Sequence, residues 1–299
     1  MTLRALTLPL RAYVFLTITA MSWGGNAVAG KLAVGHISPM LLTSVRWGLA
    51  LVVLLGFALP QVRRDLPVIR RHLPLLIAYG VFGFAFFNIL LYSALEYTTA
   101  INVAIEQAGM PMVIFLANFL LFRIKASPAQ IIGFALTLAG VAITASSGSL
   151  ERLIGLQLGR GDALMLLAVL FYGGYTVALR YKPTLHWQSM ISVMAASAFL
   201  TSLPFTAFEA ASGSVIWPDT QGWLVAAFTA VFPSLVAQVM FIKGNEIIGS
   251  NRAGVFINLV PIFGTLLSVM ILGERLQLYH VVALGLVLGG IWLAERGKR

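Results

Sequence analysis

The chain has 299 residues, of which 59% are hydrophobic and only 10% are charged, and its formal net charge is +10. A soluble globular protein has about 25% charged residues, so this composition excludes that class and indicates an integral membrane protein. The chain contains no cysteine, which excludes disulfides and thiol chemistry.

Apolar stretches follow one another along the whole chain, each close to the roughly 20 residues of helix that cross about 30 Å of hydrocarbon. They are continuous rather than alternating and exceed the ~10 residues of a barrel strand, which excludes strands. The first stretch is longer than the apolar region of a signal peptide, so we expect it to be kept as a span. The sequence therefore predicts an all-α integral membrane protein with ten transmembrane helices, near residues 12–34, 39–59, 73–95, 98–122, 127–147, 162–180, 187–208, 220–243, 252–273 and 276–294.

The basic residues are distributed unevenly between the two sides of the predicted membrane. Because Lys and Arg collect in cytoplasmic loops, their distribution predicts that both termini lie in the cytoplasm, and we expect the membrane to be the inner membrane of a bacterial cell. It also accounts for the net charge, so the lipid bilayer is an expected partner and nucleic acid is not. Four of the 20 lie on the other side, at Lys31, Arg152, Arg160 and Arg275. Fifteen lie on the predicted cytoplasmic side, at Arg4, Arg11, Arg63, Arg64, Arg70, Arg71, Arg123, Lys125, Arg180, Lys182, Lys243, Arg252, Arg296, Lys298 and Arg299.

A shift of about 150 residues aligns the chain with itself. Pro111 then falls on Pro261, and Gly140 falls on Gly290. We therefore predict two five-helix repeats, residues 1–150 and 151–299. Because five is an odd number, the second repeat enters the membrane from the opposite side. Secondary transporters use such inverted repeats around a central cavity, although a duplication that serves only folding is the alternative.

Several short motifs give the chain a family resemblance over essentially its full length. They are Trp23-Gly24-Gly25-Asn26 followed by Lys31, Ser38-Pro39 followed by Arg46, and two proline-led segments, Met110-Pro111 to Gly140 and Val260-Pro261 to Gly290. The second segment includes a Gly273-Glu274-Arg275 hairpin, where the first has Arg123-Ile124-Lys125. In these features the chain resembles the ten-helix EamA-type exporters of the drug/metabolite transporter superfamily.

This resemblance implies a basket of helices around a central cavity. It also implies export of small metabolites, such as amino acids and among them aromatic ones, or of drug-like molecules. Small multidrug transporters of the same superfamily couple transport to protons through a glutamate in their first helix. The predicted first span has no acidic residue, so the resemblance does not extend to that glutamate.

Two charged residues, Arg46 and Glu106, lie well inside the predicted spans. An ionisable group costs at least a few kcal/mol there unless it is paired or faces water. Both are expected about 10–12 Å below the non-cytoplasmic surface, because each follows the start of its helix by roughly two turns. One hypothesis places them beside a cavity, with Arg46 binding a carboxylate and Glu106 an ammonium group. The alternative is a structural ion pair that joins the second span to the fourth.

Aromatic and amide side chains complete the predicted substrate site. Aromatic faces bind apolar groups by contact area and stacking, and amides orient them by hydrogen bonds. Amides are costly when they face lipid, so we expect them to point inward, whereas core packing or lipid contact is the alternative for the aromatic residues. Besides Arg46 and Glu106, the predicted binding residues are Trp23, Asn26, Tyr79, Phe82, Phe86, Asn88, Gln107, Tyr172, Tyr175, Gln238 and Asn258.

Prolines and small residues make two further structural predictions. Proline inside a helix produces a kink, which is expected at Pro111, Pro233 and Pro261. Small residues four apart let two helices approach closely. They predict contact between the fifth and tenth spans of one chain, and hence a monomer, through Ala135, Ala139, Gly285 and Gly289.

The sequence contains no nucleotide-binding loop, metal-ligand cluster or nucleophile–base grouping, so neither a cofactor nor enzyme activity is expected. We therefore predict a secondary transporter that exports amino acids or related zwitterions by alternating access. Within transport, the alternative is a multidrug or cation exporter that depends on Glu106 alone. Outside transport, the alternatives are an intramembrane enzyme acting on lipid and a scaffold that transports nothing.

Overall fold

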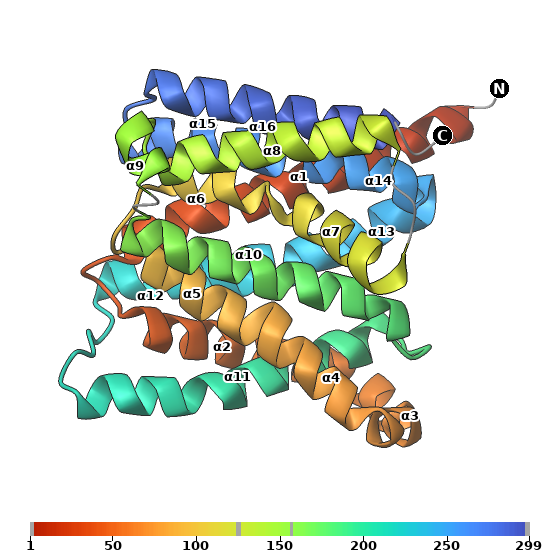
Figure 1. Ribbon diagram of the computed structural model, residues 1–299. Coiled ribbons are helices and arrows are strands. Elements are labelled where there is room, and N and C mark those ends of the chain that lie inside the picture. Colours follow the sequence, from red (N-terminus) through yellow and green to blue (C-terminus); the bar gives the residue numbers. More distant parts are fainter. Residues whose placement is uncertain (1–2, 124–126, 156–157, 297–299) are drawn as a thin grey trace.

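The computed structural model describes residues 3–123, 127–155 and 158–296, and most of them are helical. No strand occurs in these ranges. The long helices run roughly along one direction, which gives the bundle two ends (Figure 1). We name them after the short helices that lie there, the α3 end for α3 (Leu66–Arg71) and the α9 end for α9 (Leu150–Ile154).

The remaining helices follow in chain order. Up to residue 145 they are α1 (Leu3–Ala33), α2 (Pro39–Arg64), α4 (Leu73–Tyr79), the π-helix η1 (Gly80–Phe86), α5 (Phe87–Ala94), α6 (Ala100–Gln107), α7 (Met110–Phe122) and α8 (Pro128–Ala145). From residue 160 they are α10 (Arg160–Ala178), the 3-10 helix η2 (Leu179–Tyr181), α11 (Trp187–Ala211), α12 (Thr220–Val231), the π-helix η3 (Phe232–Val236), α13 (Ala237–Ile248), α14 (Ser250–Ile257), α15 (Val260–Leu272) and α16 (Leu278–Arg296).

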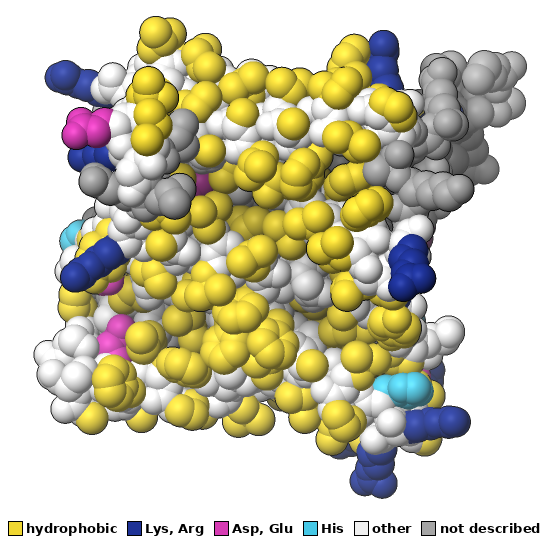
Figure 2. Space-filling model, in the orientation of Figure 1, with side chains coloured by type: hydrophobic (Ala, Val, Ile, Leu, Met, Phe, Trp, Pro, Cys, Tyr) yellow, Lys and Arg dark blue, Asp and Glu magenta, His cyan; other side chains and the backbone are white. Residues whose placement is uncertain are grey.

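The surface is that of a membrane protein. Hydrophobic side chains cover the middle of the face shown in Figure 2, and the Lys and Arg side chains on that face lie near its two ends. In the described residues, eight helical stretches are long and apolar enough to cross a membrane, and they coincide with the predicted second to ninth spans. The predicted first and tenth segments are also helical, as α1 and α16, and the count of ten spans stays a prediction.

Four of the apolar stretches are interrupted. The π-helices η1 and η3 interrupt two of them, and turns at 108–109 and 258–259 separate α6 from α7 and α14 from α15. Pro111 and Pro261 are the second residues of α7 and α15, and Pro233 lies in η3. Proline has no amide hydrogen and its ring clashes with the carbonyl four residues earlier, so a regular α-helix ends or bends at these positions.

Helices α8 and α16 lie side by side, as the small residues of the fifth and tenth spans led us to expect (Figure 1). A Cβ atom added to Gly290 would lie 2.5 Å from the carbonyl oxygen of Gly133. One added to Gly140 would lie 2.7 Å from the carbonyl oxygen of Ala283. Glycine is therefore required where the two backbones touch.

The residues predicted for this contact were wrong. Gly285 and Gly289 are exposed, and an added Cβ would meet no atom within 4 Å at either position. Ala135 and Ala139 are also exposed. The contact uses the neighbouring face of each helix, because the sequence offers small residues on two adjacent faces and their spacing does not say which one is covered.

Candidate functional site

Arg46 lies in α2 with its guanidinium inside the bundle, and only 4% of the residue is exposed. Its Nε donates to Ser234 Oγ at 2.7 Å. Its Nη1 donates to Asn26 Oδ1 at 3.0 Å, to Asn88 Oδ1 at 2.6 Å and to the hydroxyl of Tyr92. These acceptors belong to α1, α5 and η3, so this cation is a centre on which several segments of the bundle converge.

All of the side-chain acceptors of Arg46 are neutral. The rings of Trp47 and Tyr92 lie 5.1 and 5.9 Å from its guanidinium carbon and add cation–π interactions. In the described part of the chain, no carboxylate oxygen lies within 4.0 Å of its nitrogens. The alternative of a structural Arg46–Glu106 ion pair is therefore not what these residues form. A buried cation without an acid partner favours an anionic ligand.

The sequence predicted Asn26 and Asn88 for the site but did not predict Tyr92 or Ser234. Tyr92 is one helical turn beyond Asn88, and that spacing was a usable signal. Ser234 is positioned by the π-helix η3, whose five-residue hydrogen bonding changes the register of the chain. Counting residues on a regular helix therefore could not identify Ser234.

Glu106 lies near the end of α6 and is completely buried. Neither of its carboxylate oxygens has a hydrogen-bond partner among the described residues. Its acidic neighbour is Asp162, in the first turn of α10, but no hydrogen bond joins the two side chains. Glu106 thus has a second carboxyl group beside it rather than a basic partner.

Asp162 is held by a chain of hydrogen bonds. Thr98 Oγ1 donates to Asp162 Oδ1 at 2.9 Å, and Asn102 Nδ2 donates to Thr98 Oγ1 at 3.1 Å. His280 Nδ1 accepts from the backbone N–H of Gln277 at 2.9 Å, so its Nε2 is the donor to Asn102 Oδ1 at 3.0 Å. The sequence did not predict this group, because Asp162 begins a span and only a charge well inside a span demands a reason. Within the described ranges, no group of three or more His, Cys, Asp or Glu side chains could hold a metal ion.

Three of the predicted aromatic residues form a cluster, in which Tyr79 of α4 packs beside Tyr172 and Tyr175 of α10. The ring of Tyr175 lies 5.8 Å from that of Tyr79 and 5.3 Å from that of Tyr172. The hydroxyl of Tyr79 donates to the carbonyl of Ala178 at 2.7 Å. In the described residues, no hydrogen bond involves the hydroxyls of Tyr172 and Tyr175, which leaves them free for a ligand.

Phe82 and Phe86 do not share the environment of Tyr79. They pack against each other with ring centroids 5.7 Å apart, and both contact Phe171. Phe82 is 41% exposed, whereas Tyr79 is buried. The π-helix η1 begins between these residues and alters the spacing that would have placed them on one face. The stacking partner of Trp47 is Phe84, with the two rings 4.4 Å apart.

Trp23 lies where α1 meets the second half of the chain. Its indole nitrogen donates to the carbonyl of Pro233 at 3.2 Å, and its ring lies 5.4 Å from that of Phe241. Trp23, Leu16 and Phe256 line part of a crevice between α1, α13 and α14. The crevice is too narrow for a water molecule, so it is no binding site for a metabolite.

Three predicted amides have a different environment from Asn26 and Asn88. Gln107, Gln238 and Asn258 are half-buried, and their side chains form no hydrogen bond with other described residues. All three lie beside an interruption, at the end of α6, after η3 and between α14 and α15. An amide without a partner is costly in lipid, so this placement favours contact with a water-filled space.

Two acids cap helices at the α9 end, Glu209, which is buried, and Glu274, which is half-buried. Glu209 accepts from the hydroxyl of Ser38 at 2.6 Å and from the backbone N–H of Leu41 at 3.1 Å, and so holds the start of α2. Glu274 accepts from the first two amides of α6 at 2.8 and 3.0 Å. Each carboxylate lies at the positive end of a helix dipole, and each joins the second half of the chain to the first.

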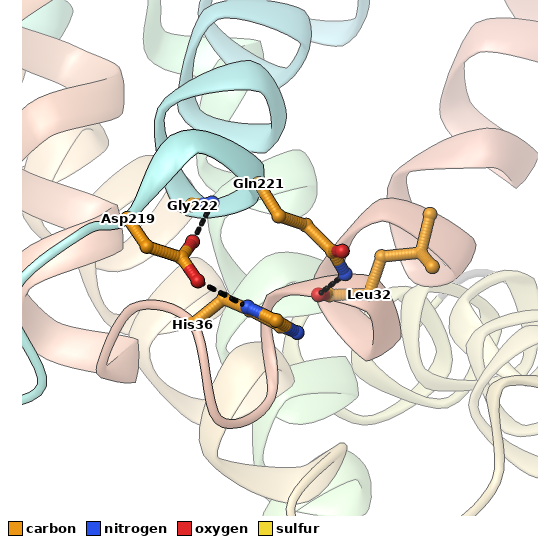
Figure 3. A network of polar contacts seen from close by, with 5 residues as sticks. All are labelled: Leu32, His36, Asp219, Gln221 and Gly222. Atoms are coloured by element: carbon orange, nitrogen blue, oxygen red, sulfur yellow. Dashed lines mark hydrogen bonds and ion pairs between the residues drawn. The ribbon is translucent and has the colours of Figure 1, made fainter.

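Figure 3 shows a third polar contact that joins the two halves of the chain at the α9 end. His36, in the loop after α1, contacts Asp219 at 2.7 Å, and Asp219 accepts from the backbone N–H of Gly222 at 2.9 Å. Gln221 Nε2 donates to the carbonyl of Leu32 at 2.8 Å. The hydrogen bonds from Gly222 and His36 hold the pKa of Asp219 below its ordinary value. This network fastens the loop to the start of α12.

The model of the EamA-like transporter family matches the chain twice, over residues 10–146 and over residues 159–295. The chain belongs to the EamA-like transporter family. The resemblance carried by the short motifs is therefore confirmed. As a member of this family the protein is a multi-pass membrane transporter and not an enzyme, and its partners are the lipid bilayer and a small-molecule substrate.

Similar proteins support the same classification. The chain is 27% identical over 295 residues to the uncharacterized transporter YetK of Bacillus subtilis, with 96% of this chain and 88% of the relative covered. It is 24% identical to the uncharacterized inner membrane transporter YedA of Escherichia coli, with 92% and 88% covered. A crystal structure with 19% identity superposes with a TM-score of 0.63 over 95% of this chain and 96% of that chain, which shows a shared fold.

Proposed function

We propose that this EamA-like transporter exports amino acids or related zwitterions by alternating access. One observation carries the proposal. Arg46 is buried and hydrogen-bonded to neutral side chains, and no acid of the described residues pairs with it. A planar guanidinium in this state favours a carboxylate, whose two oxygens match its donors. In this proposal Arg46 binds the carboxylate of the substrate and Glu106 faces its ammonium group.

The remaining predicted residues supply hydrogen bonds and apolar contacts in this proposal. Asn26 and Asn88 hold the guanidinium of Arg46 in place. The free hydroxyls of Tyr172 and Tyr175 offer hydrogen bonds beside aromatic faces, which suits an aromatic or hydrophobic amino acid. The other proposed contacts are Trp23, Tyr79, Phe82, Phe86, Gln107, Gln238 and Asn258.

Two inverted repeats, residues 1–150 and 151–299, are the proposed moving parts. Support comes from the interruptions, which occur in pairs. Each half contains one π-helix (η1 and η3) and one two-residue turn (108–109 and 258–259). Paired discontinuous helices at corresponding positions are a feature of transporter binding sites. We further propose that ten spans place both termini in the cytoplasm of a bacterial cell, that the membrane is the inner one, and that one chain is the functional unit.

Counterflow in proteoliposomes tests the substrate class. Vesicles are loaded with one unlabelled amino acid at a time, and entry of the same radiolabelled amino acid is followed. We expect accumulation of at least one amino acid and its loss in Arg46→Ala, because a charge-assisted hydrogen bond contributes about 1.5–3 kcal/mol, or roughly a 10- to 150-fold change in affinity. Arg64→Ala, an exposed arginine of the same helix, is the matched control and should transport normally. Retained transport in Arg46→Ala would contradict the proposal.

A cation exporter of the same fold is the second candidate. The absence of hydrogen bonds to Glu106 favours it, because a buried carboxylate without donors among the described residues also suits an organic cation. In that case Arg46→Ala would still transport a cationic dye, whereas Glu106→Gln would not. Uptake of a fluorescent cation by both variants separates the two candidates.

A further inference from the structure

Two buried glutamates in the described residues have opposite surroundings. Glu209 is 6% exposed and accepts from the hydroxyl of Ser38 and the backbone N–H of Leu41. Glu106 is 0% exposed and accepts no hydrogen bond from the described residues. Ionising a carboxyl group inside a protein is costly unless donors replace the lost water. Glu209 has such donors, whereas the described residues offer Glu106 none.

The neighbours of Glu106 include several charged and titratable groups. Asp162 faces it from α10, and Tyr279 and His280 of α16 lie near Asp162. Glu274, before α16, is bound to the amides at the start of α6. Lys31 of α1 donates to the carbonyls of Leu95 and Thr98 at 2.7 and 2.8 Å, and α8 and α15 contain no titratable residue. Glu106 thus interacts with a second acid, and two adjacent buried carboxyls can share one proton.

Asp162 is arranged to exchange that proton. Both of its hydrogen bonds from the described side chains, from Thr98 and Asn102, end on Oδ1. Neither of these two hydrogen bonds ends on Oδ2. Asp162 is 6% exposed and lies in the first turn of α10, whereas Glu106 is farther from the α9 end and fully buried. A proton from that end therefore reaches Asp162 before it reaches Glu106.

We propose that Glu106 and Asp162 form a proton-binding site of the transporter, loaded from the α9 end through Asp162 Oδ2. One proton adds to a carboxylate oxygen of the pair and leaves again, and no carbon–oxygen bond breaks and no electron is transferred. The pair shares no hydrogen bond with the Arg46 cluster in the described residues, and Glu106 is common to both proposals because it carries the proton when no ammonium group is bound. This inference rests on the proposed function: the transporter exchanges a proton taken up from outside for the exported solute.

Infrared spectroscopy of the full-length protein in lipid tests the site without any substrate. Difference spectra between about pH 5 and 9 should contain the C=O band of a protonated carboxylic acid that disappears at high pH. The band should be lost in Glu106→Gln and kept in Glu209→Gln, the matched buried glutamate. Asp162→Asn keeps an oxygen acceptor for Thr98 but removes the like charge, so the band should disappear at a lower pH than in the parent protein. A protein without such a band at any pH, or a band unchanged in Glu106→Gln and in Asp162→Asn, would overturn the proposal.

Transport by Asp162→Asn tests the coupling. Counterflow without a pH gradient should continue in this variant, whereas the stimulation of transport by a pH gradient should fall at least about fivefold, which is the lower range of coupling between linked sites. A parent protein that shows no counterflow with any amino acid contradicts the proposed function and leaves the infrared result standing. Gradient-driven transport that is equal in the parent and in Asp162→Asn contradicts the proton site alone.

Discussion

Helices α6 and α7 continue a single predicted span, yet they are packed differently. α6 buries seven of its eight residues, whereas α7 buries none of its 13. Even α8, which lies on the outside of the bundle, buries one stripe of residues against α16. α7 packs against α10 only through half-buried residues such as Met110 and Val113, so its inner side is less tightly packed than that of α6. The turn at 108–109 therefore separates a tightly packed segment from a loosely packed one.

The second half of the chain shows a related difference. α12 buries five of its 12 residues, whereas α13, which continues the same stretch beyond η3, buries two of 12. α7 and α13 both lie toward the α3 end (Figure 1), and the acid caps Glu209 and Glu274 lie at the α9 end. The comparison teaches that the helices pack more tightly toward the α9 end than toward the α3 end.

Cysteine labelling is the sharpest way to break this comparison, because the chain has no cysteine of its own. Asn118→Cys places a thiol on half-buried α7, and Val103→Cys places one on α6, where the residue is 0% exposed. We expect a water-soluble maleimide to react on the order of 1,000-fold faster with the first, because the second requires a local opening that costs several kcal/mol. Mass spectrometry of the transporter in membranes measures both rates. Equal rates would show that the two helices are equally accessible.

Glu209→Ala removes one of the caps that close the α9 end. It leaves the hydroxyl of Ser38 and the amide of Leu41 without their acceptor, so we expect a loss of about 2–4 kcal/mol in stability. The change is measured as a lower unfolding temperature in detergent. Glu151→Ala, at an exposed position of the same end, should leave the unfolding temperature unchanged. If both variants unfold at the same temperature, the cap does not hold this end together.

Gly24→Ala tests the contact between α1 and the first turns of α15, which follow the turn at 258–259. The added Cβ would lie 2.7 Å from the backbone nitrogen of Gly264 and 2.8 Å from the carbonyl oxygen of Val260. Moving two backbones apart should cost about 1–3 kcal/mol, measured by thermal unfolding. At Gly25 the added Cβ would lie 3.6 Å from the ring of Phe228, an ordinary contact, so Gly25→Ala is the control. Equal effects of the two variants would argue against the close backbone approach.

Asp219→Asn should have the smallest effect, because the His36–Asp219 pair is exposed to solvent. The pKa of Asp219 is lowered in the folded protein, so its carboxylate stabilises the fold above the ordinary pKa of aspartate, about 3.9. That contribution is lost as the pH falls through the lowered pKa. We therefore expect Asp219→Asn to melt slightly below the parent protein at pH 7 and to melt with it well below about pH 3. A difference that stays constant with pH would contradict a role for the carboxylate charge.

Much of the fold could be predicted from the sequence, because burial in lipid demands continuous apolar helices. The interruptions at Pro111, Pro233 and Pro261 were predictable for a covalent reason, since proline lacks the amide hydrogen. The interruption at η1 was not, because no proline lies there. Of the candidate site, Arg46 and Glu106 could be proposed from the sequence through the cost of a charge in a span, and their roles stay predictions. Asp162 could not be proposed, because a charge at the edge of a span gives no such signal.

The amino-acid sequence alone determined the class of the protein, the order of its helices and the residues whose burial demands a reason. These properties depend only on composition and local covalent structure, both of which can be read directly from the sequence. Only the tertiary structure decided that the partners of Arg46 are neutral, that Glu106 has Asp162 beside it, and which glycines of α8 and α16 touch. The physical reason is that π-helices and turns shift the register between segments, so the face that each helix presents to its neighbours depends on long-range packing.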